Sequence, residues 1–163
     1  MEAHYLNTST DGSSEKYALM GVGFTKLDEK PAAKSKGKKY ICDISETKTI
    51  TGYEWSTPFE TDQIKEEEAI KFIMDIGKYQ KIGSAAETYY IKVDMDDPAS
   101  GTSYKARKFK VAIEVDEFGN DDGQLTCKGN LLGKGDMVVG TFDVQARKFT
   151  PDSLSQGVVA SSH

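Results

Sequence analysis

The apolar residues of this chain recur mainly at every second position, and this pattern predicts a mainly β protein. Residues 86–95 and 104–115 both have this period, and the turn-forming segment 96–101 joins them. Together they predict a β-hairpin. Its inward faces would be Tyr89, Ile91, Val93 and Met95 on the first strand, and Phe109, Val111, Ile113 and Val115 on the second.

Weaker alternation predicts further strands on both sides of this hairpin. Residues 17–27 indicate one strand, and residues 40–55 indicate one or two that end near Trp55, which we interpret as a core or interface anchor. Residues 129–151 contain a glycine turn and then a strand with Val139, Thr141 and Asp143 on one face. About seven strands are therefore expected.

A helical period is found only in residues 61–76. Ile64, Ala69, Ile73 and Ile76 share one face, Thr61 or Asp62 is placed to cap the start, and Gly77 to stop the end. The three glutamates at 66–68 would lie near the N-terminal turns, where the helix dipole favours acids. We predict one helix with a solvated acidic face.

The remaining segments are polar. Residues 1–16 and 152–163 are predicted to be flexible arms around a single domain of residues 17–151. Residues 28–39 form a predicted loop with five lysines. Three interpretations of this loop stay open: a solvated loop, a contact with an acidic neighbouring subunit, or a DNA-binding patch.

Composition narrows the class of protein. The chain has 163 residues and a net charge of −5, which disfavours tight binding to nucleic acid. It has no apolar run long enough for a transmembrane helix and no apolar secretory signal, so we expect synthesis in the cytoplasm. A mildly acidic surface would also suit a conduit through which DNA slides without sticking, but it equally suits any protein that stays soluble, and the net charge does not distinguish the two.

Residues for catalysis or metal binding do not gather in any recognised motif. The histidines, His4 and His163, fall in the predicted arms, so a triad is not expected. The acidic turn 116–123 fails as a calcium loop because Phe118 and Gly129 would occupy ligand positions. Cys42 and Cys127 are interpreted as buried free thiols, with a disulfide as the alternative. We therefore expect no enzyme activity, no cofactor and no metal.

Several segments, taken in order, resemble the major tail tube proteins of long-tailed phages and phage-like particles. They are Tyr40-Ile41, Ile50-Thr-Gly-Tyr-Glu, the 62–73 segment Asp-Gln-Ile-Lys-Glu-Glu-Glu-Ala-Ile-Lys-Phe-Ile, Gly129-Asn-Leu-Leu-Gly-Lys-Gly-Asp, Gly140-Thr-Phe-Asp and Phe149-Thr-Pro. They span most of residues 17–151. The resemblance implies two packed antiparallel sheets, in a β-sandwich or partial barrel, with one flanking α-helix and extended loop and terminal arms.

The resemblance also implies a function. Such subunits form hexameric rings that stack into a tube for DNA delivery, and the rings contact tape measure, terminator and baseplate or tip proteins. The protein would be assembled in the host cytoplasm and found in the virion tail. Within this hypothesis, lysines of the 28–39 loop would contact acids of a neighbouring subunit, and the residues concerned would be Lys34, Lys36, Lys38, Lys39, Asp116, Glu117, Asp121 and Asp122.

A second hypothesis is a β-sandwich module that binds a ligand or serves adhesion. Exposed Trp and Tyr beside a groove would favour it, and self-polymerisation would count against it. The sequence does not distinguish a contractile from a non-contractile tail, or a virion from a tail-like bacteriocin.

Overall fold

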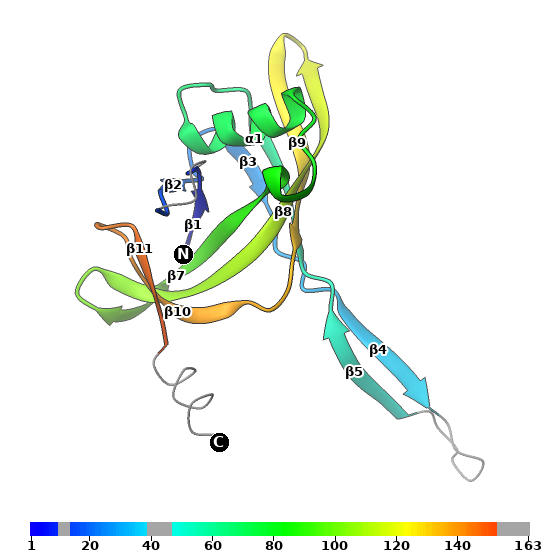
Figure 1. Cartoon of the computed structure of the whole chain (residues 1–163), viewed down its shortest axis with the longest axis vertical. Helices are drawn as coiled ribbons and strands as arrows, with labels where there is room; N and C mark the ends of the chain where they lie inside the picture. Colours follow the sequence, from blue (N-terminus) through cyan, green and yellow to red (C-terminus); the bar gives the residue numbers. More distant parts are fainter. Residues whose placement is uncertain (10–13, 39–46, 153–163) are drawn as a thin grey trace.

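The computed structural model describes residues 1–9, 14–38 and 47–152, and this part of the chain consists mainly of antiparallel strands (Figure 1). One α-helix, α1 (Glu68–Lys78), and one 3₁₀ helix, η1 (Gly83–Ala86), are present in the described residues. The predicted mainly β class, with two antiparallel sheets and one helix, is confirmed. The strands are β1 (Glu2–Asn7), β2 (Tyr17–Leu19), β3 (Phe24–Leu27), β4 (Ala33–Lys38), β5 (Thr47–Tyr53), β6 (Ser56–Asp62), β7 (Glu87–Ser100), β8 (Ser103–Asp121), β9 (Gln124–Gly133), β10 (Val138–Asp143) and β11 (Lys148–Pro151).

Nine strands form one strongly curved sheet: seven follow the order β2-β1-β7-β8-β9-β6-β3, and β10 and β11 branch from β8. Strand β8 organises it, because β7 pairs with one edge while β9 and β10 follow each other along the other edge. Strand β11 then pairs with β10. The predicted hairpin of residues 86–115 is confirmed, since β7 and β8 pair antiparallel from Glu87↔Ala112 onward. The sheet does not close into a barrel.

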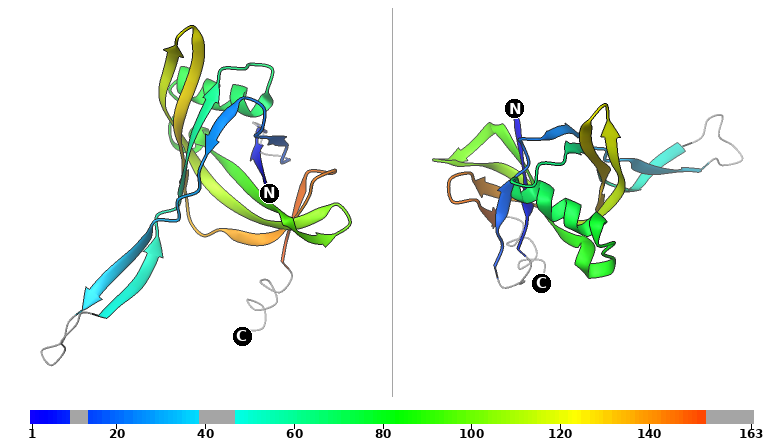
Figure 2. Two further views of the ribbon diagram at one scale, coloured as in Figure 1. Left: turned by 180° about the vertical axis from the view of Figure 1, so that it is seen from behind. Right: turned by 90° about the horizontal axis from the view of Figure 1, so that it is seen from above.

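The second sheet is the two-stranded hairpin β4–β5, which pairs from Ala33↔Tyr53 to Lys38↔Thr47. It extends away from the rest of the molecule in all views (Figures 1 and 2). The predicted 28–39 loop is therefore strand from residue 33 onward. The alternating lysines and small residues of β4 did not predict this strand, because neither of its faces is apolar.

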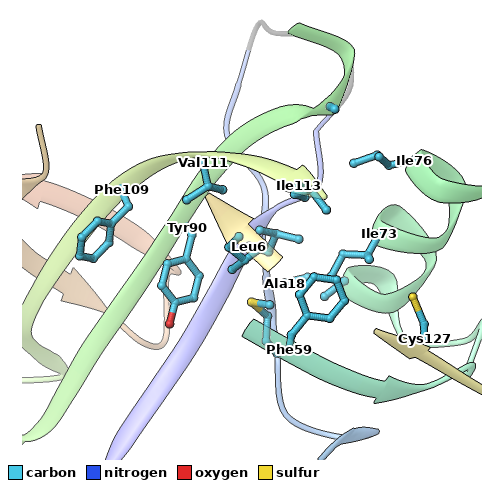
Figure 3. Packing of buried hydrophobic residues seen from close by; sticks show 14 residues of the cluster. Leu6, Ala18, Phe59, Ile73, Ile76, Tyr90, Phe109, Val111, Ile113 and Cys127 are labelled. Carbon is cyan, nitrogen blue, oxygen red and sulfur yellow. The ribbon is translucent and has the colours of Figure 1, made fainter. Parts of the chain in front are cut away.

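Two apolar clusters lie on opposite faces of β1 and β7. Leu6 and Tyr90 point into the cluster beneath α1, whereas Tyr5 and Ile91 point into the cluster covered by β10 and β11. Figure 3 shows Ile73 and Ile76 of α1 turned toward Leu6 and Ile113. Burial on both faces explains why β7 contains consecutive buried residues and does not alternate strictly.

The prediction of a flexible arm over residues 1–16 is wrong for Glu2–Asn7, which form strand β1, while residues 10–13 lie outside the described residues. Strand β1 lies between β2 and β7, and Leu6 is fully buried. Strand β1 pairs with both neighbours at Tyr5, which lies opposite Leu19 of β2 and Ile91 of β7. The short strand Glu-Ala-His-Tyr-Leu-Asn carries too few apolar residues to stand out in a polar segment. Residues 153–163 lie outside the described residues, so most of the predicted C-terminal arm does as well.

The predicted helix began too early. Residues 56–62 form β6, in which Thr57, Phe59 and Thr61 point inward, and α1 begins only at Glu68. Pro58 lies within β6, opposite Asn130 of β9, and its carbonyl accepts a hydrogen bond from the Asp28 amide at 3.3 Å. The residue before the helix is Glu67, which makes no side-chain cap, so the predicted Thr61 or Asp62 cap is wrong.

Gly77 lies within α1 and does not terminate it. A Cβ atom at this position would lie 2.6 Å from Cγ1 of Val115 and 2.9 Å from Cζ of Phe118. The missing side chain therefore lets the helix pack directly against β8.

The predicted strand over residues 17–27 is interrupted. Strand β2 ends at Leu19, and Gly23, with a φ of +90°, turns the chain into β3. The turns predicted at 96–101 and 116–123 are shorter than expected, because β7 reaches Ser100 and β8 reaches Asp121.

Candidate inter-subunit surfaces

The β4–β5 hairpin is exposed on both faces. Ile50 and Tyr53 are 61% and 63% accessible, although both are large apolar residues. The described side chains of β4 are all exposed. A two-stranded ribbon without a packed face is only marginally stable by itself, so this hairpin is a surface that a partner would stabilise.

The lysines of this hairpin differ in their contacts. Lys34 forms an ion pair with Glu54 at 2.6 Å, whereas Lys36 makes no ion pair with any described residue. Lys38 is the last described residue of β4, and Lys39 lies outside the described residues. Lys34 and Lys36 share a face of β4 by alternation, so they can act together toward a partner.

The predicted acidic partners lie at the far end of the molecule from these lysines. Asp116 and Glu117 belong to the distal half of β8, Asp121 ends this strand, and Asp122 is in the turn that follows. Figure 1 places this β8–β9 end and the β4–β5 hairpin at opposite ends of the long axis. The lysines of the hairpin and these acids therefore do not meet within one chain. A contact between them would have to join two copies of the protein.

Acidic residues also cover the outward face of strands β8, β9, β6 and β3. Asn130 Nδ2 donates hydrogen bonds to Glu114 at 3.1 Å and to Asp116 at 3.3 Å. Glu60 lies 3.6 Å from Lys128 and 3.9 Å from Lys26. Asp62 and Glu117 lie on the same face. Among these described residues there are therefore five acids against two lysines, Lys26 and Lys128, so this part of the face is negative at neutral pH.

These four strands have two open edges. No described strand pairs with β8 beyond Ala112 on the side away from β9, or with β3 on the side away from β6. The order β8-β9-β6-β3 contains three antiparallel steps, so β3 runs antiparallel to β8. The β3 edge of one copy could therefore continue the antiparallel ladder at the β8 edge of another.

A charged cluster fixes the root of the projecting hairpin. Glu29, just before β4, accepts hydrogen bonds from Trp55 Nε1 at 2.7 Å, Lys92 Nζ at 2.8 Å and both terminal nitrogens of Arg107 at 2.8 and 3.0 Å. Lys92 also contacts Glu2 at 3.0 Å. Since Glu29 precedes β4 and Trp55 follows β5, one carboxylate ties both legs of the hairpin to β7 and β8.

The electrostatics of Glu29 follow from these contacts. Burial alone would raise its pKa, but the hydrogen bonds from Arg107, Lys92 and Trp55 outweigh burial and lower the pKa to about 2. This cluster was not predicted from the sequence. Alternation with Ile91 and Val93 would put Lys92 on the outward face of its strand, and nothing in a single sequence reveals that Glu29, Lys92 and Arg107 meet.

A groove of about 890 Å³ lies beside this cluster, where the hairpin leaves the body. Trp55 stacks on Phe109 at its floor, with ring centroids 4.1 Å apart, which agrees with its interpretation as an anchor. Tyr53, Leu132 and Met137 contribute apolar walls.

The remaining candidate residues show no catalytic arrangement in the described part of the chain. His4 lies in β1, not in an arm, and its Nδ1 contacts the Tyr90 hydroxyl. Burial, together with Lys92, lowers the pKa of His4. Cys127 is a buried free thiol, as predicted, and burial raises its pKa to about 11. Cys42 and His163 lie outside the described residues.

Residues 1–9, 14–38 and 47–152 contain no group of three or more His, Cys, Asp or Glu positioned for a metal ion. In the same ranges, no helix is both long and apolar enough to span a membrane. No protein-family model matches the chain, and no curated protein is found to be similar to it.

Proposed function

We propose that this protein is a self-assembling structural subunit, and specifically the tube protein of a phage or phage-like tail. The observation that carries the proposal is the β4–β5 hairpin, which extends into solvent with exposed apolar and basic side chains (Figure 1). A surface of this kind promotes aggregation of a monomer, whereas in an assembly a neighbouring subunit covers it.

The open edges of β3 and β8 support a ring. Repeated antiparallel pairing of these edges is a head-to-tail contact, and a contact of this type closes into a ring when its rotation permits. Ring closure would remove both edges. The expectation of six subunits in each ring comes from the resemblance to tail tube proteins.

The distribution of charge supports stacking of such rings and passage of DNA. A basic hairpin at one end of the subunit and acids at the other would attract each other between successive rings. The other acids of the outward face, Glu60, Asp62 and Glu114, would line the tube and repel a passing polyanion. Asp116 and Glu117 would instead contact the hairpin of the next ring. In this proposal, the tube joins tape measure, terminator and baseplate or tip proteins in the virion tail, and the subunit needs no cofactor or catalytic group.

Negative-stain electron microscopy and sedimentation of the concentrated protein test the proposal. We expect rings or tubes with a central hole. The double variant Lys34→Glu and Lys36→Glu should stay at the size of a single ring or smaller, and adding Glu117→Lys should restore stacking. Lys78→Glu with Lys81→Glu is the matched control, since it makes the same change in charge at the exposed end of α1.

One observation favours the second hypothesis, a ligand-binding module. Tyr53, which is exposed, and Trp55, which is half-buried, both line a groove, which is close to the arrangement expected for that class. Wild-type protein that remained monomeric at high concentration and bound a small ligand at this groove, with a change in Trp55 fluorescence, would favour the binding module over the tube subunit.

A further inference from the structure

The groove at the root of the hairpin exposes apolar side chains that nothing in the described part of the chain covers. Met137 is 47% accessible and Leu132 is 37% accessible, and Tyr53 stands beside them. The charged residues that line the groove are three acids, Glu29, Glu54 and Asp136, and one cation, Arg107, so an acidic segment would be disfavoured. The groove therefore favours an uncharged, apolar occupant.

The described chain ends next to this groove. Strand β11 runs antiparallel to β10 and brings Pro151 opposite Gly140. The amide of Asp152 then donates a hydrogen bond to the carbonyl of Val139 at 3.0 Å. Met137 of the groove wall is only two residues before Val139 in the sequence, so residue 153 starts close to the groove.

The segment that follows has the chemistry the groove favours. Residues 153–163 read Ser-Leu-Ser-Gln-Gly-Val-Val-Ala-Ser-Ser-His and contain no acidic residue, lysine or arginine. Val158 and Val159 are its most apolar pair, with Leu154 four residues before Val158. Residues 153–157 can span up to about 17 Å when extended. The two-residue step from Val139 to Met137 covers only about 7 Å along the strand, so Val158 can reach the groove of its own chain.

We propose that residues 153–163 fold back onto the groove of the same chain, with Val158 and Val159 covering Tyr53, Leu132 and Met137. The apolar walls gain a cover, and no charge has to be desolvated to provide it. Tethering favours this intramolecular occupant over a second copy, because the linker is short and long enough to span the distance. The proposal does not depend on the tube function and applies to the monomer.

The single tryptophan provides the test, because Trp55 lies in the groove. In the full chain, the double variant Val158→Asp and Val159→Asp should lower the ratio of docked to undocked tail roughly tenfold or more. Trp55 emission should then move to longer wavelength, and acrylamide should quench it more strongly. The control is Ser161→Asp with Ser162→Asp, which adds the same charge beyond the apolar pair and should resemble wild type.

A second variant changes the groove and leaves the tail intact. Met137→Asp should open the tail contact, so adding the valine substitutions to it should change Trp55 quenching no further. The measurements should be made at about 1 μM and repeated at about 100 μM, where only contacts between copies respond to concentration. Equal quenching in wild type and the valine variant would overturn the proposal. Protection that appeared only at the higher concentration would also overturn it, because the tail of a second copy would then be the occupant.

Discussion

The sharpest prediction concerns the carboxylate that ties the hairpin to the sheet. Glu29→Gln preserves size and one carbonyl acceptor, so it mainly removes the charge that Lys92 and Arg107 share. Lys92, which is 6% accessible, would keep only Glu2 as an ion-pair partner among the described residues. We therefore expect a loss of stability, because a buried cation loses most of its compensation.

The magnitude follows from the pKa of Glu29. A fall from 4.5 to about 2 corresponds to an upper bound of about 3 kcal/mol in the free energy of unfolding. Arg107 is 29% accessible, and screening by solvent reduces the expected loss to about 1–2 kcal/mol. Because the pKa is lower in the folded state, this stabilisation is complete above about pH 4.5 and disappears as the pH falls toward 2.

Urea unfolding followed by far-UV circular dichroism measures the difference between wild type and Glu29→Gln. The difference should be constant from pH 7 to 5 and should shrink from pH 5 to 3. Glu54→Gln is the matched control, since its ion pair with Lys34 is more than half exposed on both sides and should contribute below about 1 kcal/mol. A loss of equal size in the two variants, or a loss from Glu29→Gln that did not change down to pH 3, would refute the reasoning.

Two further predictions concern packing. Gly77→Ala should lower the free energy of unfolding in urea by about 1–2 kcal/mol, because overpacking against Val115 exceeds the gain in helix propensity. Gly52→Ala is the control and should have little effect, because no atom lies within 4 Å of the added Cβ. A stabilised Gly77→Ala variant would contradict this packing. Leu6→Ala should cost about 2–5 kcal/mol, because Leu6 is fully buried, and Leu19→Ala at a 42% accessible position should cost under about 1 kcal/mol. Similar stability of wild type and Leu6→Ala, by thermal unfolding, would mean that β1 is a dispensable arm after all.

The amino-acid sequence by itself determined the class of fold and its central hairpin. Strict alternation over residues 104–115 specified the inward residues Phe109, Val111 and Ile113, because the two-residue period of a strand leaves no other face for them. The helix was also predictable in type, since Ile73 and Ile76 repeat at helical spacing. Its start was not, because the polar segment 56–67 suits a strand, a cap or a loop.

Only the tertiary structure decided which polar residues act together. Glu29, Lys92 and Arg107 are separated by up to 78 positions, and their meeting depends on how β7 and β8 pass the root of the hairpin. The same holds for β1, which is mostly polar in sequence but is paired along both of its edges in the sheet, because β2 and β7 supply the neighbours that bury it. Local periodicity specifies the faces of an element, whereas long-range pairing specifies its partners, and the surfaces proposed here for assembly depend on those partners.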